Sequence, residues 1–169
     1  IQVGKYSVVP LPSPSWIMGR ILRLEVENFK SYGGQHAIPF HEKFNAVIGS
    51  NGSGKSNVMK AISFVLGIRS AELGSDKLRD LIFRPDQGRP AQRLAARVTL
   101  VYLVDEADED VKDAEPGEEL FFTRCISPSG TGSYKLSVGE GNERDVTWEE
   151  YEEQMNQIKI NVHCRKTFL

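Results

Sequence analysis

Apolar and polar residues alternate in several short stretches of the chain. Ile21–Phe29 alternates over most of its length, which predicts a half-buried β-strand. A second, short strand is predicted at His36–Phe40, and Pro39 places it near a sheet edge because proline cannot donate a hydrogen bond to a neighbour. Phe44–Ile48 is a compact apolar run followed by glycine, which is typical of a buried strand.

Two segments change to helical spacing. Between Lys55 and Leu66 the apolar residues recur at the spacing of one helix face, and Gly67 can end the predicted helix. Trp148–Ile158 predicts a second helix with glutamates in its first turn, where the helix dipole favours negative charge. The remaining segments are β-rich, with strands expected at Arg97–Val104, Leu120–Ile126 and Tyr134–Val138 and an acidic loop at Glu106–Glu119.

Length and composition indicate one globular domain. The chain has 169 residues, of which 40% are hydrophobic and 26% charged, and no run approaches the roughly 18 apolar residues that a membrane helix requires. Residues 1–17 contain prolines among serines, and Met18 opens the patterned region, so we expect a non-domain extension followed by a domain over residues 18–169. Cys125 and Cys164 have no paired spacing, which argues against a zinc site or a disulfide framework and favours a reducing compartment.

The net charge of −2 conceals an uneven distribution. Residues 18–97 contain 13 Lys and Arg against 7 Asp and Glu, whereas residues 98–169 contain 7 against 16. The basic first half favours polyanions such as ATP or DNA. A solvated surface of mixed charge is the alternative explanation, and the charge pattern alone does not decide between them.

One motif, at Gly49–Ser56, carries recognisable chemistry. Its glycines permit backbone angles that turn successive N–H groups toward phosphate oxygens, and the N-terminus of the following helix adds partial positive charge. Lys55 is expected to reach the β- and γ-phosphates, and the Ser56 hydroxyl to bind Mg²⁺. Because a predicted buried strand leads in and a predicted helix leads out, a glycine-rich turn without a ligand explains the segment poorly. The segment is Gly49-Ser50-Asn51-Gly52-Ser53-Gly54-Lys55-Ser56, which matches the phosphate-binding pattern (P-loop) G-x-x-x-x-G-K-[ST].

The sequence around this motif resembles the structural maintenance of chromosomes (SMC) family, whose members belong to the ABC-type ATPases. The resemblance is strong from about residue 19 to residue 83 and looser, but collinear, through to the end of the chain. It is closer to the first SMC subunit of cohesin than to the condensin subunits. The matching segments are Glu27–Tyr32, Phe44–Ser56, Asn57–Gly67 and Leu78–Ile82.

The resemblance implies a fold, cofactors and partners. The implied fold is α/β: the N-terminal lobe of a P-loop, ABC-type ATPase head with an antiparallel β subdomain. The implied cofactors are ATP and Mg²⁺, and Lys30, Ser31 and Asn57 fall near the nucleotide. In this family two heads sandwich two ATP molecules, and long coiled coils enclose DNA. The implied partners are therefore the C-terminal lobe of the same polypeptide, a second SMC head, a kleisin-type subunit and DNA, in the nucleus and on the chromosome, with roles in the cell cycle and DNA repair.

Three positions depart from the family pattern. Ser50 stands where the family usually has proline, and Lys60 replaces a usual acidic residue. Gly74 falls where the family commonly has an arginine that approaches the nucleotide or DNA. Glycine cannot supply that contact, so Arg69 or Lys77 would have to take it over.

Two other segments imitate ATPase motifs. Leu100–Glu106 looks like a Walker B strand, whose Asp105 and Glu106 would hold Mg²⁺ and polarise water, but the acidic run after it favours a hairpin loop. Leu136–Glu140 faintly resembles the ABC signature, yet it follows the Walker B candidate instead of preceding it. His163–Leu169 resembles the family text just before the glutamine loop. If both segments are decoys, a Walker B carboxylate, a signature and a glutamine loop lie outside these 169 residues.

The sequence therefore predicts Mg²⁺-ATP binding within a cohesin-like SMC ATPase head that supports head engagement, DNA entrapment and sister chromatid cohesion. We expect the isolated chain to bind nucleotide weakly and to hydrolyse it negligibly. Two alternatives remain. One is a self-sufficient small P-loop NTPase or helicase-like domain that uses Asp105 and Glu106. The other is a non-catalytic interaction module that holds nucleotide.

Overall fold

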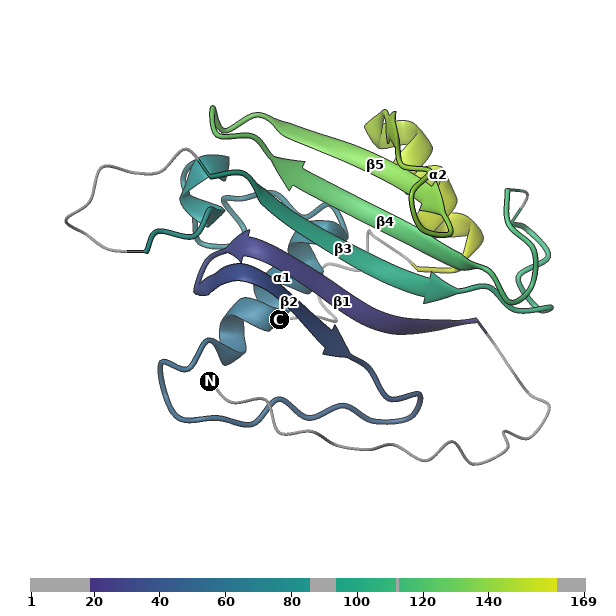
Figure 1. Ribbon diagram of the computed structural model, residues 1–169, viewed down its shortest axis with the longest axis horizontal. Helices are drawn as coiled ribbons and strands as arrows, with labels where there is room; N and C mark the ends of the chain where they lie inside the picture. Colours follow the sequence, from purple (N-terminus) through teal and green to yellow (C-terminus); the bar gives the residue numbers. More distant parts are fainter. Residues whose placement is uncertain (1–18, 86–93, 112, 161–169) are drawn as a thin grey trace.

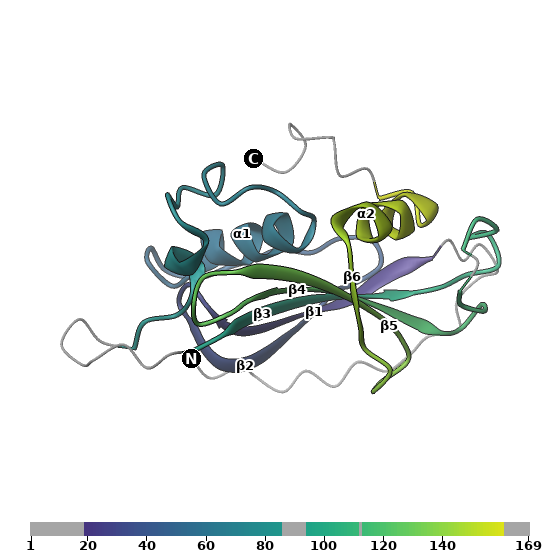
Figure 2. The ribbon, with the colours of Figure 1, turned by 90° about the horizontal axis from the view of Figure 1, so that it is seen from above.

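Six antiparallel strands form one sheet, and two helices pack on the same face of it. The computed structural model describes residues 19–85, 94–111 and 113–160. Figure 1 shows the strands of the sheet, and Figure 2 shows α1 and α2 lying together above it. The strand order is β2-β1-β3-β4-β5-β6. The elements are β1 (Arg20–Phe29), β2 (Tyr32–Pro39), α1 (Lys55–Val65), the 3-10 turn η1 (Leu78–Leu81), β3 (Ala96–Leu103), β4 (Glu119–Ile126), β5 (Gly132–Val138), β6 (Arg144–Val146) and α2 (Trp148–Gln157).

Alternation along β1 decides which side chains enter the core. Leu24 and Val26 face the helices and are buried. The register shifts between Glu27 and Phe29, where Asn28 adopts a left-handed backbone with φ +49°. This irregularity breaks the two-residue period, and it allows Phe29 to be fully buried although it lies three positions after Val26.

The P-loop helix ends as its sequence predicts. Gly67 has φ +88°, and the N–H of Ile68 reaches the carbonyl of Ser63 at 3.0 Å while that of Gly67 reaches Phe64 at 3.0 Å. These two bonds form a Schellman motif, in which the residue after the cap needs a left-handed backbone. A Cβ added at Gly67 would also lie 2.1 Å from the Trp148 ring, so glycine is required twice over.

Aromatic side chains fill the space between the sheet and the helices. Phe29 of β1 meets Phe64 of α1 at 5.2 Å between ring centroids. Phe122 of β4 meets Tyr151 of α2 edge-to-face at 5.7 Å. All four rings are fully buried, and each contributes roughly 2–3 kcal/mol of hydrophobic stabilisation. The two helices are thus fixed to the sheet through different strands.

Most predicted elements are confirmed, with ends that shift by a few residues. The edge position of β2 is also confirmed, as is the loop between β3 and β4 in its described part. Neither β6 nor η1 was predicted, because both are very short. The predicted extension at residues 1–17, Cys164 and the segment His163–Leu169 lie outside the described residues.

The predicted buried strand at Phe44–Ile48 is wrong for this structure. After β2 the chain returns toward α1 as an irregular segment that makes a wide excursion beyond the sheet (Figure 1). Phe44 is 78% exposed, Val47 47% and Ile48 91%. A strand needs hydrogen-bonding neighbours, and none of the described strands pairs with this segment. Phe44–Ile48 is therefore an apolar segment that does not form a strand in this structure.

Candidate nucleotide-binding site

Residues 41–48 form an exposed return segment after β2, and the P-loop joins this segment to α1. Gly52 has φ +83° and Gly54 has φ +95°, a left-handed conformation that residues with a side chain rarely adopt. Gly54 is the N-cap of α1, and no side chain caps the helix there. The first turn of α1 also contains no acidic residue. The free N–H groups and the positive end of the helix dipole thus face outward at Lys55 and Ser56, which is the arrangement that binds phosphate.

The amine of Lys55 lies against its own loop. Its Nζ donates to the carbonyl oxygens of Gly49 at 2.6 Å and Ser50 at 2.7 Å. Ser53 closes the same turn, since its N–H donates to the Ser50 carbonyl at 3.2 Å. The lysine is therefore held against two carbonyl oxygens of its own loop, and a bound phosphate would replace these partners with oxyanion partners.

The turn between β1 and β2 contacts the loop directly. The Ser31 hydroxyl accepts a 2.9 Å hydrogen bond from the side-chain amide of Asn57. It would also lie only 2.7 Å from a Cβ added at Gly54. The structure thus brings Ser31, Gly54 and Asn57 together, as the resemblance implied. Their contact with a nucleotide stays a prediction.

Tyr32 is a neighbour that the sequence analysis missed. Its hydroxyl donates to the carbonyl oxygen of Gly54 at 3.3 Å, and burial raises its pKa. In the sequence Tyr32 only opens a glycine turn, so no pattern indicated that its ring would reach across to the start of α1.

Lys30 has other partners. It has a left-handed backbone with φ +50°, and its Nζ donates to the Ser75 hydroxyl at 2.7 Å and to the Asp80 carbonyl at 3.3 Å. Burial lowers its pKa, as do the nearby charges of Lys60 and Arg84. Lys30 therefore ties β1 to the segment around η1, and its predicted contact with phosphate remains untested.

The Ser56 hydroxyl suits a magnesium ion in part. Ser56 lies exposed in the first turn of α1, and Mg²⁺ prefers oxygen ligands and keeps several waters. Within the described ranges, no group of three or more His, Cys, Asp or Glu side chains could hold a metal. The predicted contact of Ser56 with Mg²⁺ stays a prediction. Ser50, Asn51 and Ser53 lie in the same loop, and their predicted contact with a nucleotide also stays a prediction.

Comparison with known proteins identifies the fold. The model of the RecF/RecN/SMC N-terminal domain matches residues 20–163. The chain belongs to this family. It is 42% identical over 156 residues to structural maintenance of chromosomes protein 1 of Arabidopsis thaliana and 41% identical over 159 residues to that of Schizosaccharomyces pombe. These matches cover 92% and 88% of the chain but only 11% and 12% of the relatives.

Solved SMC heads have the same fold. One structure, from work on ATP-driven dimerisation and DNA-stimulated activation of SMC ATPases, is similar with a TM-score of 0.69 and 34% identity over 83% of this chain and 80% of that one. The Smc head of Pyrococcus furiosus, bound to the C-terminal domain of ScpA, is similar with a TM-score of 0.70 and 33% identity, over 86% of this chain and 34% of that one. The predicted family and the predicted N-terminal lobe are therefore confirmed.

The Walker B decoy of this SMC lobe lies far from the P-loop. Leu103 pairs with Arg20 at the start of β1, whereas the P-loop adjoins the residues after the end of β1. Ten residues of strand at about 3.3 Å each put roughly 30 Å between them. Asp105 accepts a hydrogen bond from the Ala107 N–H and shapes the loop. The alternative of a self-sufficient NTPase that uses Asp105 and Glu106 is not supported by this position.

The second decoy is equally remote. Val138 pairs with Leu120, and Leu120 pairs with Tyr102, at that same distant end of the sheet. The Ser137 hydroxyl donates to the Gly139 carbonyl instead of presenting itself to a ligand. Leu136–Glu140 is therefore a strand with its turn.

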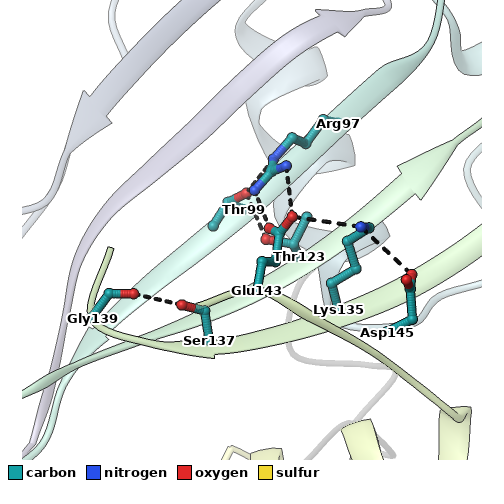
Figure 3. Close-up of polar contacts among 8 residues, drawn as sticks. All are labelled: Arg97, Thr99, Thr123, Lys135, Ser137, Gly139, Glu143 and Asp145. Atoms are coloured by element: carbon teal, nitrogen blue, oxygen red, sulfur yellow. Dashed lines mark hydrogen bonds and ion pairs between the residues drawn. The ribbon is translucent and has the colours of Figure 1, made fainter. Parts of the chain in front are cut away.

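The face of the sheet opposite the helices carries a charge-balanced network (Figure 3). Arg97 pairs with Glu143 of the β5–β6 turn, and Lys135 lies 3.6 Å from both Glu143 and Asp145. Because acids and bases neutralise one another here, the basic excess of the first half of the chain does not form a cationic surface at this network.

Gly74 has a conformational reason to be glycine. Its φ is +71°, so the arginine that the family commonly has here would be strained in this turn. Its nearest side chain is Lys60, whose Nζ would lie 3.9 Å from an added Cβ. Arg69 and Lys77 are exposed on the same segment. Their predicted role as substitutes is not tested by these contacts.

Proposed function

We propose that this chain binds Mg²⁺-ATP as the N-terminal lobe of a cohesin-like SMC ATPase head. The observation that carries the proposal is the helix N-terminus at Gly54 and Lys55, which has no side-chain cap and follows a left-handed glycine loop. Such an end binds anions through N–H groups and dipole together. Lys55 adds a positive charge at the same place.

The exposed return segment supports the proposal that this lobe forms only part of the ATPase site. Phe44, Val47 and Ile48 form an apolar run beside the P-loop that this lobe leaves open. A neighbouring sheet would satisfy both its backbone and its side chains, and we assign that sheet to the C-terminal lobe of the same polypeptide. ABC-type hydrolysis would then need that lobe and the signature motif of a second SMC head.

The wider role follows the family. The chain is similar to a head studied for ATP-driven dimerisation and DNA-stimulated activation, and to a head bound to ScpA. By this similarity we propose a second SMC head, a kleisin-type subunit and DNA as partners. Coiled coils, DNA entrapment, sister chromatid cohesion, DNA repair and a location on chromosomes in the nucleus belong to the same proposal. Among the described residues, no helix is long and apolar enough to cross a membrane.

A titration of the chain with a fluorescent ATP analogue and Mg²⁺ tests the proposal. Lys55→Ala should abolish saturable binding, because it removes the phosphate-facing charge. Lys43→Ala removes an equal charge from the exposed return segment and serves as the matched control. Binding that is equal in all three proteins, or absent from the wild-type chain, would contradict the proposal.

A turnover assay addresses the rival enzyme. The chain alone should hydrolyse ATP negligibly, and Glu106→Gln should not change the turnover of a head reconstituted with its C-terminal lobe. Several turnovers per second by the chain alone, lost in Glu106→Gln, would restore the self-sufficient NTPase.

A further inference from the structure

Two buried side chains hold the end of α1 that lies opposite the P-loop. Arg124 of β4 is 7% exposed, and its Nη1 donates to the carbonyl oxygens of Phe64 at 2.7 Å and Ile68 at 2.9 Å. Tyr151 of α2 is fully buried, and its hydroxyl donates to the carbonyl of Val65 at 2.9 Å. The last carbonyls of a helix have no partner within it. The Phe64 carbonyl also accepts the N–H of Gly67, so Arg124 adds a second bond there, while Tyr151 gives the buried Val65 carbonyl a donor.

The guanidinium of Arg124 is itself fixed by rings. It lies 4.3 Å from the centroid of Phe64 and 5.2 Å from that of Tyr134. Burial lowers the pKa of Arg124, and the neighbouring hydroxyls of Tyr134 and Tyr151 oppose that effect. An arginine remains cationic under such conditions, so a positive charge lies at the negative end of the helix dipole.

We propose that Arg124 and Tyr151 are positioning residues for the nucleotide site. They anchor the C-terminal end of α1 to β4 and α2, and they thereby set the direction in which its N-terminus presents Lys55 and the loop amides to phosphate. The effect on affinity rests on the proposed function. The anchoring of the helix does not.

The geometry of a short helix explains how contacts at one end reach the other. α1 has 11 residues and is therefore roughly 16 Å long. Its N-terminus has no capping side chain, so its direction depends on packing and on the contacts at its far end. A small tilt of α1 about its Phe64 end would displace the loop amides at its other end, and this displacement grows with the tilt angle and with the length of the helix. Because loop amides bind phosphate only in a narrow geometry, such a tilt lowers affinity.

Hydrogen exchange tests the anchoring without any nucleotide. Arg124→Met keeps the length and apolar contacts of the side chain but removes both bonds, and it should speed amide exchange across Met59–Leu66, whose N–H groups are hydrogen-bonded within α1. Arg124→Lys retains one charged donor and should restore protection in part. Leu136→Ala in β5 is the matched control, since it weakens the core near α2 without touching the α1 carbonyls. Equal acceleration in Leu136→Ala and Arg124→Met would overturn the proposal by showing general destabilisation.

Affinity for Mg²⁺-ATP is the second readout. Arg124→Met should raise Kd by about tenfold and Tyr151→Phe, which loses only the hydroxyl, by about threefold. Tyr151→Phe keeps the ring, so it tests the idea even if Arg124→Met does not fold. An unchanged Kd with unchanged exchange in the Tyr151→Phe and Arg124→Lys chains would overturn the inference. A wild-type chain that binds no ATP would overturn the proposed function, whereas the exchange data would still judge the anchoring.

Discussion

The side-chain amide of Asn57 donates a 2.9 Å hydrogen bond to the hydroxyl of Ser31. This contact joins the first turn of α1 to the turn that follows β1. Ser31→Ala removes it and should weaken Mg²⁺-ATP binding about threefold, since a neutral hydrogen bond near the surface contributes about 0.5–1 kcal/mol. Ser129→Ala removes a comparable exposed hydroxyl in the β4–β5 turn and should leave affinity unchanged. A calorimetric titration of both variants decides the matter, and equal affinities would refute a role for Ser31.

Alanine substitutions at two glycines of the P-loop should distinguish the cost of backbone strain from the cost of steric crowding. Gly52 and Gly54 both have left-handed backbones, but a Cβ at Gly52 meets nothing within 4 Å, whereas one at Gly54 lies 2.7 Å from the Ser31 hydroxyl. Gly52→Ala should therefore cost about 1 kcal/mol of unfolding free energy from strain alone. Gly54→Ala should cost more and should abolish ATP binding. Urea denaturation of both variants gives the difference, which should shrink when Ser31→Gly is added to Gly54→Ala.

The exposed return segment gives a prediction in which stability and association respond differently. Phe44→Ser and Ile48→Ser should change the unfolding free energy of this chain by less than about 0.5 kcal/mol, because exposed side chains contribute little. The same changes should weaken binding of the C-terminal lobe, as measured by co-purification or calorimetry. Phe64→Ser in the core is the contrasting control and should destabilise the chain by several kcal/mol, about 3–5. A large loss of stability in Ile48→Ser would show that the segment packs within this lobe.

Alkaline pH should destabilise the fold through Tyr102. Its hydroxyl bonds to Asp108, and burial together with that carboxylate raises its pKa above the ordinary value of 10.0. Above pH 10 the unfolded phenol loses its proton while the folded one keeps it, so the native state binds more protons and stability falls as pH rises. The slope contributed by this residue is at most about 1.4 kcal/mol per pH unit.

Denaturation between pH 8 and pH 11 measures that slope. Tyr102→Phe should have lower stability at pH 8, because Asp108 loses a donor, but a shallower decline above pH 10. Tyr151 has a pKa raised in the same way by complete burial, so some alkaline decline should persist in this variant. A decline as steep as that of the wild-type chain would rule out Tyr102 as a contributor.

Local patterns were enough to predict five of the six strands and both α-helices of the described residues. The alternation in Ile21–Phe29 located β1, and the helical spacing before Gly67 located α1 and its end. Both depend on which face of an element is apolar and on one residue that permits a left-handed backbone, and such information is local. The same holds for the P-loop, because its pattern of glycines, lysine and serine encodes the backbone conformation directly.

The buried strand predicted at Phe44–Ile48 failed for the opposite reason. Its apolar composition is a local property, but a strand exists only when another strand pairs with it, and the described part of the chain provides none. The position of Lys30 is a similar case, since only the fold shows that Ser75 and Asp80 receive its amine.

The sequence by itself determined most of the helices and strands, the P-loop motif and the family. Only the tertiary structure showed that Asp105 lies at the far end of β3 from the P-loop, and that Arg124 and Tyr151 reach the last carbonyls of α1 from 60 and 86 residues away. Spacing along a chain constrains contacts within a helix turn or a strand pair. Contacts between distant segments depend on strand order and helix packing, which follow from the burial of the whole core.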